Sequence, residues 1–141
     1  MVRIVCKKGT MQVQITISTL EQLNDVTRQL QNELQQWAVP EDKQMELRLC
    51  LMEAAQNGLL YGGCPQAGQP AEVQISWQCS EHCFVYSVED NGPGIPAELR
   101  ERSWDDISLE EHGRGILLMQ AMLDEVTFNE KGNRITGRMC W

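Results

Sequence analysis

The stretch Val88–Pro96, "VEDNGPGIP", decides the fold prediction, because a β-strand pattern ends there in acids, glycines and prolines. The residues just before it, "CFVYSV", form an apolar run typical of a strand. Asp90, Gly92 and Gly94 then follow at the end of that run. Glycine has no Cβ atom, so the backbone can bend there and come close to another group. The stretch therefore raises the question of what approaches the end of this strand.

Other segments show the alternation of apolar and polar residues that predicts β-strands. "AEVQISWQ" (71–78) and "HCFVYSVE" (82–89) are joined around "CSEH", which predicts a hairpin. Residues 11–17 alternate in the same way near the start of the chain. "DEVTFNE" and "RITGRMCW" predict two more strands, joined by a turn over residues 131–133.

Three segments between the strands have the apolar spacing of helices. The first helix is predicted to begin at "STLE", with Ser18 as its N-cap and Glu21 completing a capping box. It should end before Pro40, which restricts the preceding residue to extended geometry. A second helix begins near Pro40 and should end at the glycine pair 62–63. A shorter apolar helix follows "GRG", residues 113–115.

The order of these elements predicts the fold class. Strands that are adjacent in sequence favour antiparallel pairing, so we expect an α+β, two-layer α/β sandwich. Its sheet should be mixed but mostly antiparallel, with the helices on one face. The length of 141 residues fits a single domain over residues 1–141. A long polar, non-periodic segment predicts a lid at about residues 95–112, with one short helical turn at "PAELRER".

Composition excludes several classes of protein. The net charge of −8 argues against direct nucleic-acid binding, which needs a basic surface. No apolar run is long enough for a transmembrane helix, and the first residues do not resemble a signal peptide. These features predict a cytoplasmic protein with no membrane contact.

The six cysteines are expected to be free thiols, because nothing in the sequence indicates secretion. Cys79, His82 and Cys83 in "CSEHC" could supply metal ligands. No second pair at zinc spacing accompanies them, and the segment has the pattern of a turn, so a metal site there is not favoured.

The residues that carry chemistry lie in three separate parts of the sequence. Glu53 and Asn57 are four apart on the second helix, so they share one face. Asp90 and the two glycines of "DNGPG" end a strand, and Gly113, Arg114 and Gly115 open the last helix. Each pattern alone is common. Their order along the chain is more specific: a helical acid and amide, a strand-end Asp, a lid, and glycines at a helix N-terminus.

These motifs resemble those of the gyrase, Hsp90, histidine-kinase and MutL ATPase superfamily, which has the Bergerat-type ATP-binding fold. "EAAQN" is similar to the N-box of that superfamily, "DNGPG" to its first glycine box and "GRG" to its second. Within the superfamily the sequence is most similar to bacterial anti-sigma-factor serine/threonine kinases of the RsbW type, notably in "HGRGILLMQAMLDEVTF". The similarity covers about residues 11–140.

The resemblance implies an ATP site with Mg²⁺, and the residue chemistry agrees with that role. Asp90 can accept a hydrogen bond from the adenine amino group. Asn57 supplies an oxygen ligand for Mg²⁺, and Glu53 can act as the general base for an attacking hydroxyl. The glycines Gly92 and Gly94 allow close backbone approach, and Gly113, Arg114 and Gly115 are expected to bind phosphate at the N-terminus of the last helix.

The family also implies protein partners. A kinase of this type binds a sigma factor, or instead binds and phosphorylates an anti-sigma-factor antagonist protein on Ser or Thr. Relatives often form homodimers, so a homodimer is left open. An alternative is an ATP-binding regulatory module of the same fold without kinase activity. The ATPase half of a histidine kinase is disfavoured because only His82 and His112 are present and no paired dimerisation helices are expected. Gyrase- and MutL-type functions are disfavoured because no transducer domain is expected.

Overall fold

The structure of the chain is a computed structural model, and it describes residues 2–7, 9–100 and 114–141. Its strands form one six-stranded sheet in the order β1-β2-β3-β4-β6-β5. The strands are β1 (Val2–Lys7), β2 (Thr10–Ile17), β3 (Val73–Cys79), β4 (Cys83–Asp90), β5 (Glu125–Phe128) and β6 (Arg134–Cys140). The helices are α1 (Leu20–Gln36), α2 (Glu41–Tyr61), the 3₁₀ helix η1 (Pro65–Ala67), α3 (Ala97–Arg100) and α4 (Arg114–Met122).

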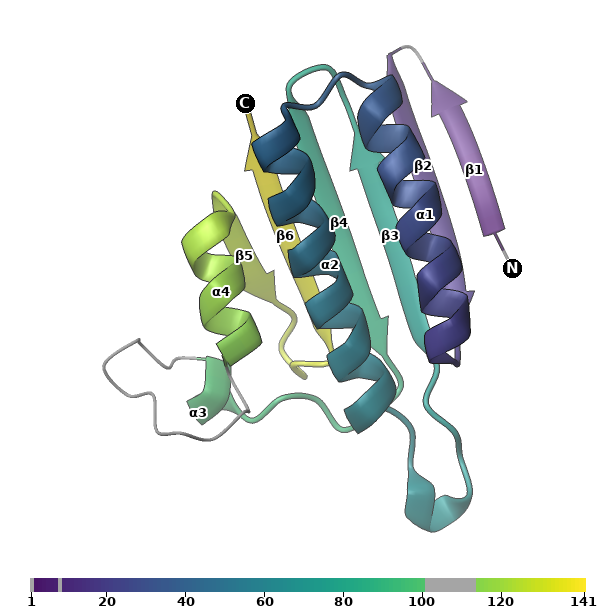
Figure 1. Ribbon diagram of the computed structural model, residues 1–141. Coiled ribbons are helices and arrows are strands. Elements are labelled where there is room, and N and C mark those ends of the chain that lie inside the picture. The colour runs from purple at the N-terminus through teal and green to yellow at the C-terminus, as the bar shows by residue number, and fades with distance from the viewer. Residues whose placement is uncertain (1, 8, 101–113) are drawn as a thin grey trace.

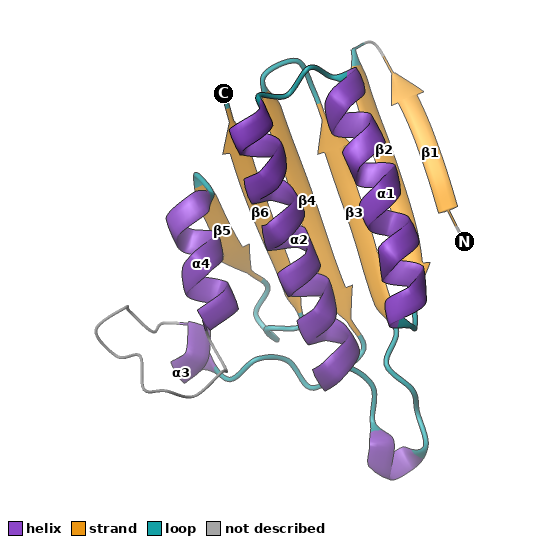
Figure 2. Ribbon diagram, in the orientation of Figure 1, coloured by secondary structure: helices purple, strands orange, loops and turns teal. Residues whose placement is uncertain are grey.

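The predicted α+β sandwich is confirmed: α1, α2 and α4 cover one face of the sheet (Figure 1), and none of the described helices lies on the other face (Figure 2). One detail of the prediction is wrong. All five strand pairings are antiparallel, so the sheet is not mixed over the residues that the structure describes. Three of the pairings, β1–β2, β3–β4 and β5–β6, join strands that are linked by a short turn. Such a turn reverses the chain and therefore makes the two strands antiparallel.

Strand β1 was not predicted from the sequence. It pairs with β2 in a hairpin whose turn contains Gly9, at a φ of 76°. Register places Val2 and Ile4 on the same face as the core residues of β2, yet each side chain is 54% exposed. No described helix covers this edge of the sheet (Figure 1). The strand therefore depends mainly on its backbone pairing with β2.

The N-cap of α1 differs from the prediction by one residue. Thr19, not Ser18, is the N-cap, and its Oγ1 accepts a hydrogen bond from the backbone N–H of Gln22 at 3.1 Å. The Gln22 side chain in turn accepts from the backbone N–H of Thr19 at 3.2 Å and from that of Ser18 at 2.6 Å. A capping box needs its acceptor three residues after the cap. Gln22 can serve both preceding N–H groups, whereas Glu21 lies one position too early for Thr19.

The core lies between the helices and the covered face of the sheet. Strand residues alternate between buried and more exposed positions, and α1 adds Leu23, Val26, Leu30 and Leu34 on one stripe. Glu33 is also buried there, and its carboxylate accepts from the indole N–H of Trp77 at 2.5 Å and from the Gln29 amide at 3.3 Å. These bonds satisfy a charge that would otherwise be costly to bury.

Helix α2 lies between α1 and α4, and it positions the predicted acid and amide (Figure 1). It begins and ends as predicted, at Glu41 and at Tyr61 before the glycine pair. Gly58 lies in its interior, where glycine costs about 1 kcal/mol relative to alanine. A Cβ atom at Gly58 would lie 2.9 Å from a methyl carbon of Val73. The glycine therefore lets α2 pack close to the sheet beside Asp90.

The cysteine prediction is partly wrong. Cys83 and Cys140 form a disulfide bond between β4 and β6, whereas Cys6, Cys50, Cys64 and Cys79 are free. The register of the sheet places the two bonded residues directly opposite each other, a fact that their separation in sequence hides. Among the described residues, no group of three His, Cys, Asp or Glu side chains is placed so that it could hold a metal ion.

Two further expectations concern the lid and membrane spans. The segment predicted as a lid, about residues 95–112, lies mostly outside the described residues, and so do Gly113 and the side chain of Arg114. Within the described part, α3 confirms the short helical turn in "PAELRER". None of the helices that the structure describes combines the length and apolarity needed to cross a membrane.

Candidate nucleotide site

A cavity of about 650 Å³ lies at the end of the sheet where β4 finishes. Its walls come from α2, the end of β4, the loop after β4, the first two turns of α4, and the end of β5 and start of β6 with the turn between them. Glu53, Asn57, Asp90 and Gly94 are all among its lining residues. The structure thus gathers predicted site residues from two separate parts of the sequence around one volume. A second hollow, of about 590 Å³ on the helix-free face, is lined by none of the predicted site residues.

Asp90 is held by hydrogen bonds at the end of β4. Its carboxylate Oδ1 accepts from the backbone N–H of Gly92 at 2.7 Å, and its backbone oxygen accepts from the Asn133 amide at 2.9 Å. Burial raises the pKa of Asp90, and the Gly92 N–H and the Lys131 charge partly oppose this. A carboxylate has lone pairs on both oxygens. One oxygen fixes the turn, and the other remains suited to a ligand donor.

The two glycines after Asp90 make room for protein backbone. A Cβ atom at Gly92 would lie 2.6 Å from the carbonyl oxygen of Tyr61, at the end of α2. Gly94 has a φ of 91° and lies against the carbonyl of Lys131, while Ile95 N–H donates to Gly132 O at 2.9 Å. Of the two glycines Gly92 and Gly94, only Gly94 lines the cavity. These glycines therefore join the loop after β4 to α2 and to the β5–β6 turn, and by doing so they shape the cavity wall.

Glu53 and Asn57 lie on the cavity side of α2, as their spacing predicts. Glu53 is packed against the start of α4. A Cβ atom at Gly115 would lie 2.5 Å from Glu53 Cγ and 2.7 Å from its Oε1. Only glycine at position 115 lets the N-terminal turn of α4 come this close to the carboxylate. The N–H groups and the dipole at the N-terminus of a helix suit an anionic ligand.

The donor set fits a magnesium ion that is held largely by a nucleotide. Asn57 offers one neutral oxygen and Glu53, one turn earlier, offers a carboxylate. Mg²⁺ is usually bound by one or two protein groups, with phosphates and water completing its octahedron.

Several residues of the site were missed by sequence reasoning. Asn133 lines the cavity and holds Asp90, and Asn129 donates to Asn133 Oδ1 at 2.8 Å. Asn91 binds the loop after α2: its amide donates to Pro70 O at 3.0 Å, and its oxygen accepts from Glu72 N–H at 2.8 Å. An Asn at a strand end or in a turn is a detectable signal, but its partner is fixed only by the tertiary fold.

The cavity also has an apolar part. Tyr61 is 53% exposed and lines the cavity. Met119 is both buried in the core and part of the lining. Further apolar lining comes from Leu60, Val88, Ile95, Ile116, Phe128 and Ile135. A mostly apolar cavity with a few placed polar groups is typical of a small-molecule site.

Comparison with known proteins agrees with this geometry. A family model described as the histidine kinase-like ATPase domain matches residues 16–141, which include every lining residue of the cavity. A search of curated proteins found no match. Because the family match covers nearly the whole chain and the fold is the expected two-layer sandwich, the chain belongs to the histidine kinase-like ATPase domain family.

Proposed function

We propose that the chain is an ATP-dependent serine/threonine protein kinase that also sequesters a sigma factor. In this function it binds ATP with Mg²⁺ and phosphorylates an anti-sigma-factor antagonist, so that the two partners compete for the kinase. Membership of the ATPase domain family supports nucleotide binding. The regulatory partners are supported by the resemblance of the motifs to anti-sigma-factor kinases.

The polar and apolar walls of the cavity can contact different parts of a bound nucleotide. Asp90 accepts from the adenine amino group, while apolar side chains such as Ile95 and Met119 contact the base. The phosphates extend toward Asn57 and the N-terminal turn of α4. Bound Mg²⁺ would neutralise phosphate charge there.

The observation that carries the kinase proposal is the position of Glu53. Its carboxylate lies against Gly115, beside the helix terminus that suits phosphate. In the proposed reaction the partner's Ser or Thr oxygen bonds to the γ-phosphorus, the bond to the ADP oxygen breaks, and Glu53 accepts the hydroxyl proton. A module that only binds nucleotide has no need of a carboxylate base beside the γ-phosphate.

Two substitutions test the division of roles in α2. Glu53→Gln keeps shape and polarity but cannot accept the proton, so phosphoryl transfer should fall by about 10²–10⁴-fold while ATP binding persists. Asn57→Ala should weaken Mg²⁺-dependent binding as well as transfer. Glu46→Gln is the matched control, because Glu46 is on the same helix, is paired with Lys43 at 3.6 Å and does not line the cavity.

The measurement uses the purified chain, ATP labelled on the γ-phosphate and protein partners captured by pull-down and identified by mass spectrometry. Thermal stabilisation by ATP with Mg²⁺ reports binding, since a ligand that binds only the native state stabilises it. A wild-type chain that binds ATP and a partner but transfers no phosphate would favour the regulatory module without kinase activity. Transfer at the wild-type rate by Glu53→Gln would remove Glu53 from the role of base.

A further inference from the structure

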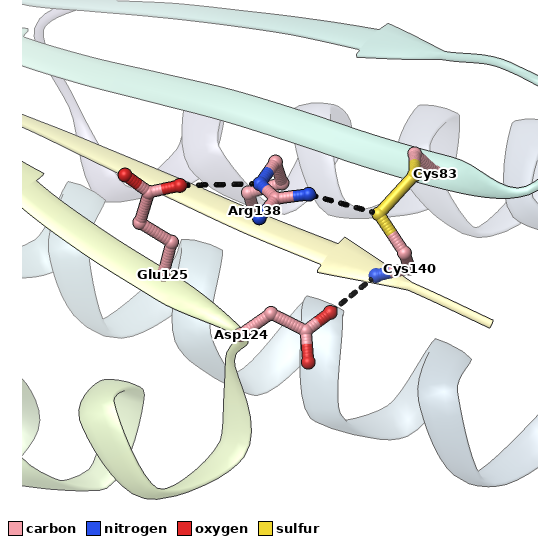
Figure 3. Close-up of polar contacts among 5 residues, drawn as sticks. All are labelled: Cys83, Asp124, Glu125, Arg138 and Cys140. Carbon is pink, nitrogen blue, oxygen red and sulfur yellow. Dashed lines mark hydrogen bonds and ion pairs between the residues drawn. A yellow bond between two sulfur atoms is a disulfide. The ribbon is translucent and has the colours of Figure 1, made fainter.

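Cys83 and Cys140 are joined by a disulfide bond (Figure 3). Cys83 begins β4, so the bond lies at the opposite end of that strand from Asp90. Both cysteines are partly exposed. Cys83 precedes Phe84 and Cys140 follows Met139, and the side chains of these two neighbours are buried on the helix side of the sheet. Since side chains alternate along a strand, the two sulfurs face the helix-free side. A small thiol in solution can therefore reach this bond without opening the core.

The sheet holds the two cysteines together independently of their bond. Cys83 and Cys140 are one of seven opposed pairs between β4 and β6, which continue to the pair of Glu89 with Arg134. Backbone N–H of Trp141 also donates to the His82 oxygen at 2.9 Å, just beyond the pair. Reduction of the bond would leave these interactions in place. The two thiols would stay opposed and ready to be oxidised again.

The surroundings of the two sulfurs differ. Arg138 Nη1 donates to Cys140 Sγ at 3.4 Å, and Arg138 Nε donates to the Glu125 carboxylate at 3.2 Å (Figure 3). Asp124 accepts from the Cys140 backbone N–H at 2.6 Å, and its charge opposes that of the guanidinium. Arg138 is nevertheless the charged group in contact with the sulfur itself. A nearby guanidinium favours a thiolate.

We propose that Cys83 and Cys140 form a redox-active pair that exchanges with low-molecular-weight thiols, with Cys83 as the attacked sulfur and Cys140 as the leaving thiolate. An external thiolate bonds to Cys83 Sγ, the Cys83–Cys140 bond breaks, and its electron pair passes to Cys140 Sγ beside Arg138. A second external thiolate then attacks the external sulfur of the mixed disulfide and releases Cys83. In total, two thiols are oxidised to one disulfide, the protein bond gains two electrons, and the two thiol protons end on the cysteines.

The remaining cysteines give internal controls for this site. Burial raises the pKa of Cys50 to about 12, with Glu46 and Glu53 adding to the shift, and burial with Glu33 raises that of Cys79 to about 12. Both thiols should therefore stay unreactive in the native chain. Cys6 is exposed and Cys64 is partly exposed. These two can be blocked with N-ethylmaleimide before the disulfide is challenged.

The test maps the first adduct on the native, oxidised chain. After the free thiols are blocked, the chain is treated with limiting glutathione, quenched with isotope-labelled N-ethylmaleimide and analysed by peptide mass spectrometry. Glutathione is expected on Cys83 and the labelled maleimide on Cys140. Excess glutathione disulfide should later restore the bond. An adduct mainly on Cys140, no reduction of the native chain by excess glutathione, or failure to re-form the bond would each overturn the proposal.

Arg138 variants separate its charge effect from a structural role. Arg138→Gln should slow reduction roughly two- to tenfold and spread the adduct over both cysteines, because leaving-group stabilisation is lost. Arg138→Lys should restore part of the preference. Arg134→Gln is the matched control, since Arg134 lies on the same strand and face but donates to Ser87 at 3.0 Å. If Arg138→Gln keeps both the wild-type rate and the preference for Cys83, the assignment of Arg138 is wrong.

Discussion

The two ends of β4 belong to one strand but are built for different purposes. The site end finishes in Asp90 and the glycines that follow, beside a cavity of about 650 Å³. The cystine end begins at Cys83, which is bonded covalently to β6. At about 3.3 Å per residue, the two ends lie roughly 23 Å apart. The difference shows how one strand can position a ligand site at one end while a disulfide fixes its pairing with β6 at the other.

The polar contacts at the two ends follow the same division. At the site end, hydrogen bonds from Gly92 and Asn133 orient Asp90 but leave open volume next to it. At the cystine end, Asp124 and Arg138 contact Cys140 directly. The comparison predicts that changes at the site end alter nucleotide chemistry, whereas changes at the cystine end leave it unaltered and affect stability or the disulfide itself. Three substitutions test this, in decreasing order of their expected effect on nucleotide chemistry.

The largest effect of the three is expected for Gly115→Ala. The added Cβ atom would meet Glu53 at 2.5–2.7 Å, so either the carboxylate or the start of α4 must move. A displacement of about 1 Å near the reacting atoms can cost roughly 10²-fold in rate. Phosphoryl transfer should fall by that order in a single-turnover assay with labelled ATP. Gln120→Ala, at an exposed position on the same helix, is the control. Unimpaired transfer by Gly115→Ala would show that the contact does not position Glu53.

A smaller effect, on affinity, is expected for Asp90→Asn. The amide still accepts from Gly92 N–H, but it loses the charge that strengthens the bond to the adenine amino group, and ATP affinity should fall about tenfold. Titration calorimetry measures the change. Glu89→Gln is the control, because Glu89 is the adjacent carboxylate on β4 and does not line the cavity. Equal affinity of Asp90→Asn and wild type would remove Asp90 from the adenine site.

The same variant should change the pH dependence of stability in the absence of ligand. Burial raises the folded-state pKa of Asp90 above the ordinary value of 3.8, so the folded chain binds the proton more tightly than the unfolded chain. The contribution of Asp90 to stability therefore falls as pH rises from 3.8 through the folded-state pKa, and is constant above it. The Asp90→Asn variant should not show this decline in stability with rising pH. At neutral pH it should therefore melt at a higher temperature than wild type. A lower melting temperature than wild type at neutral pH would contradict the burial argument.

The smallest effect on nucleotide chemistry is expected for loss of the disulfide. The bond closes a loop between positions 57 apart in sequence, and such bonds typically contribute about 2–4 kcal/mol to the free energy of unfolding. The double variant Cys83→Ala, Cys140→Ala should therefore melt several degrees lower. Its affinity for ATP should stay within about twofold of wild type, since the cavity is roughly 23 Å away. A large loss of affinity would show that the two ends of β4 are coupled, and the comparison would fail.

Sequence reasoning succeeded where the signal is local or follows a fixed period. The bounds of helix α2, the β3–β4 hairpin and the shared face of Glu53 and Asn57 all follow from patterns within short stretches of sequence. Asp90 lines the same cavity as these two residues, as the resemblance of the motifs implied. Their roles in binding and transfer remain predictions.

What the sequence did not reveal depends on contacts between distant segments. The Cys83–Cys140 bond needs the register between β4 and β6, and no local pattern encodes that register. Asn133 is a turn residue by sequence and a partner of Asp90 only after the sheet forms. Strand β1 carries Arg3 and Lys7 among its apolar residues and is largely exposed, so its pattern was weak. The N-cap of α1 is Thr19 rather than the predicted Ser18, because its capping box is completed by Gln22 and not by Glu21.

The part of the cavity wall formed by Phe128, Gly132 and Asn133 has a consequence for biosynthesis. The ribosome makes Glu53, Asn57 and Asp90 well before it makes this turn, and Asn133 holds the Asp90 backbone only after β6 joins the sheet. A nascent chain that carries the first glycine motif alone thus lacks one wall of the proposed nucleotide pocket. ATP bound there as proposed would favour the completed fold, but only after β6 has joined the sheet.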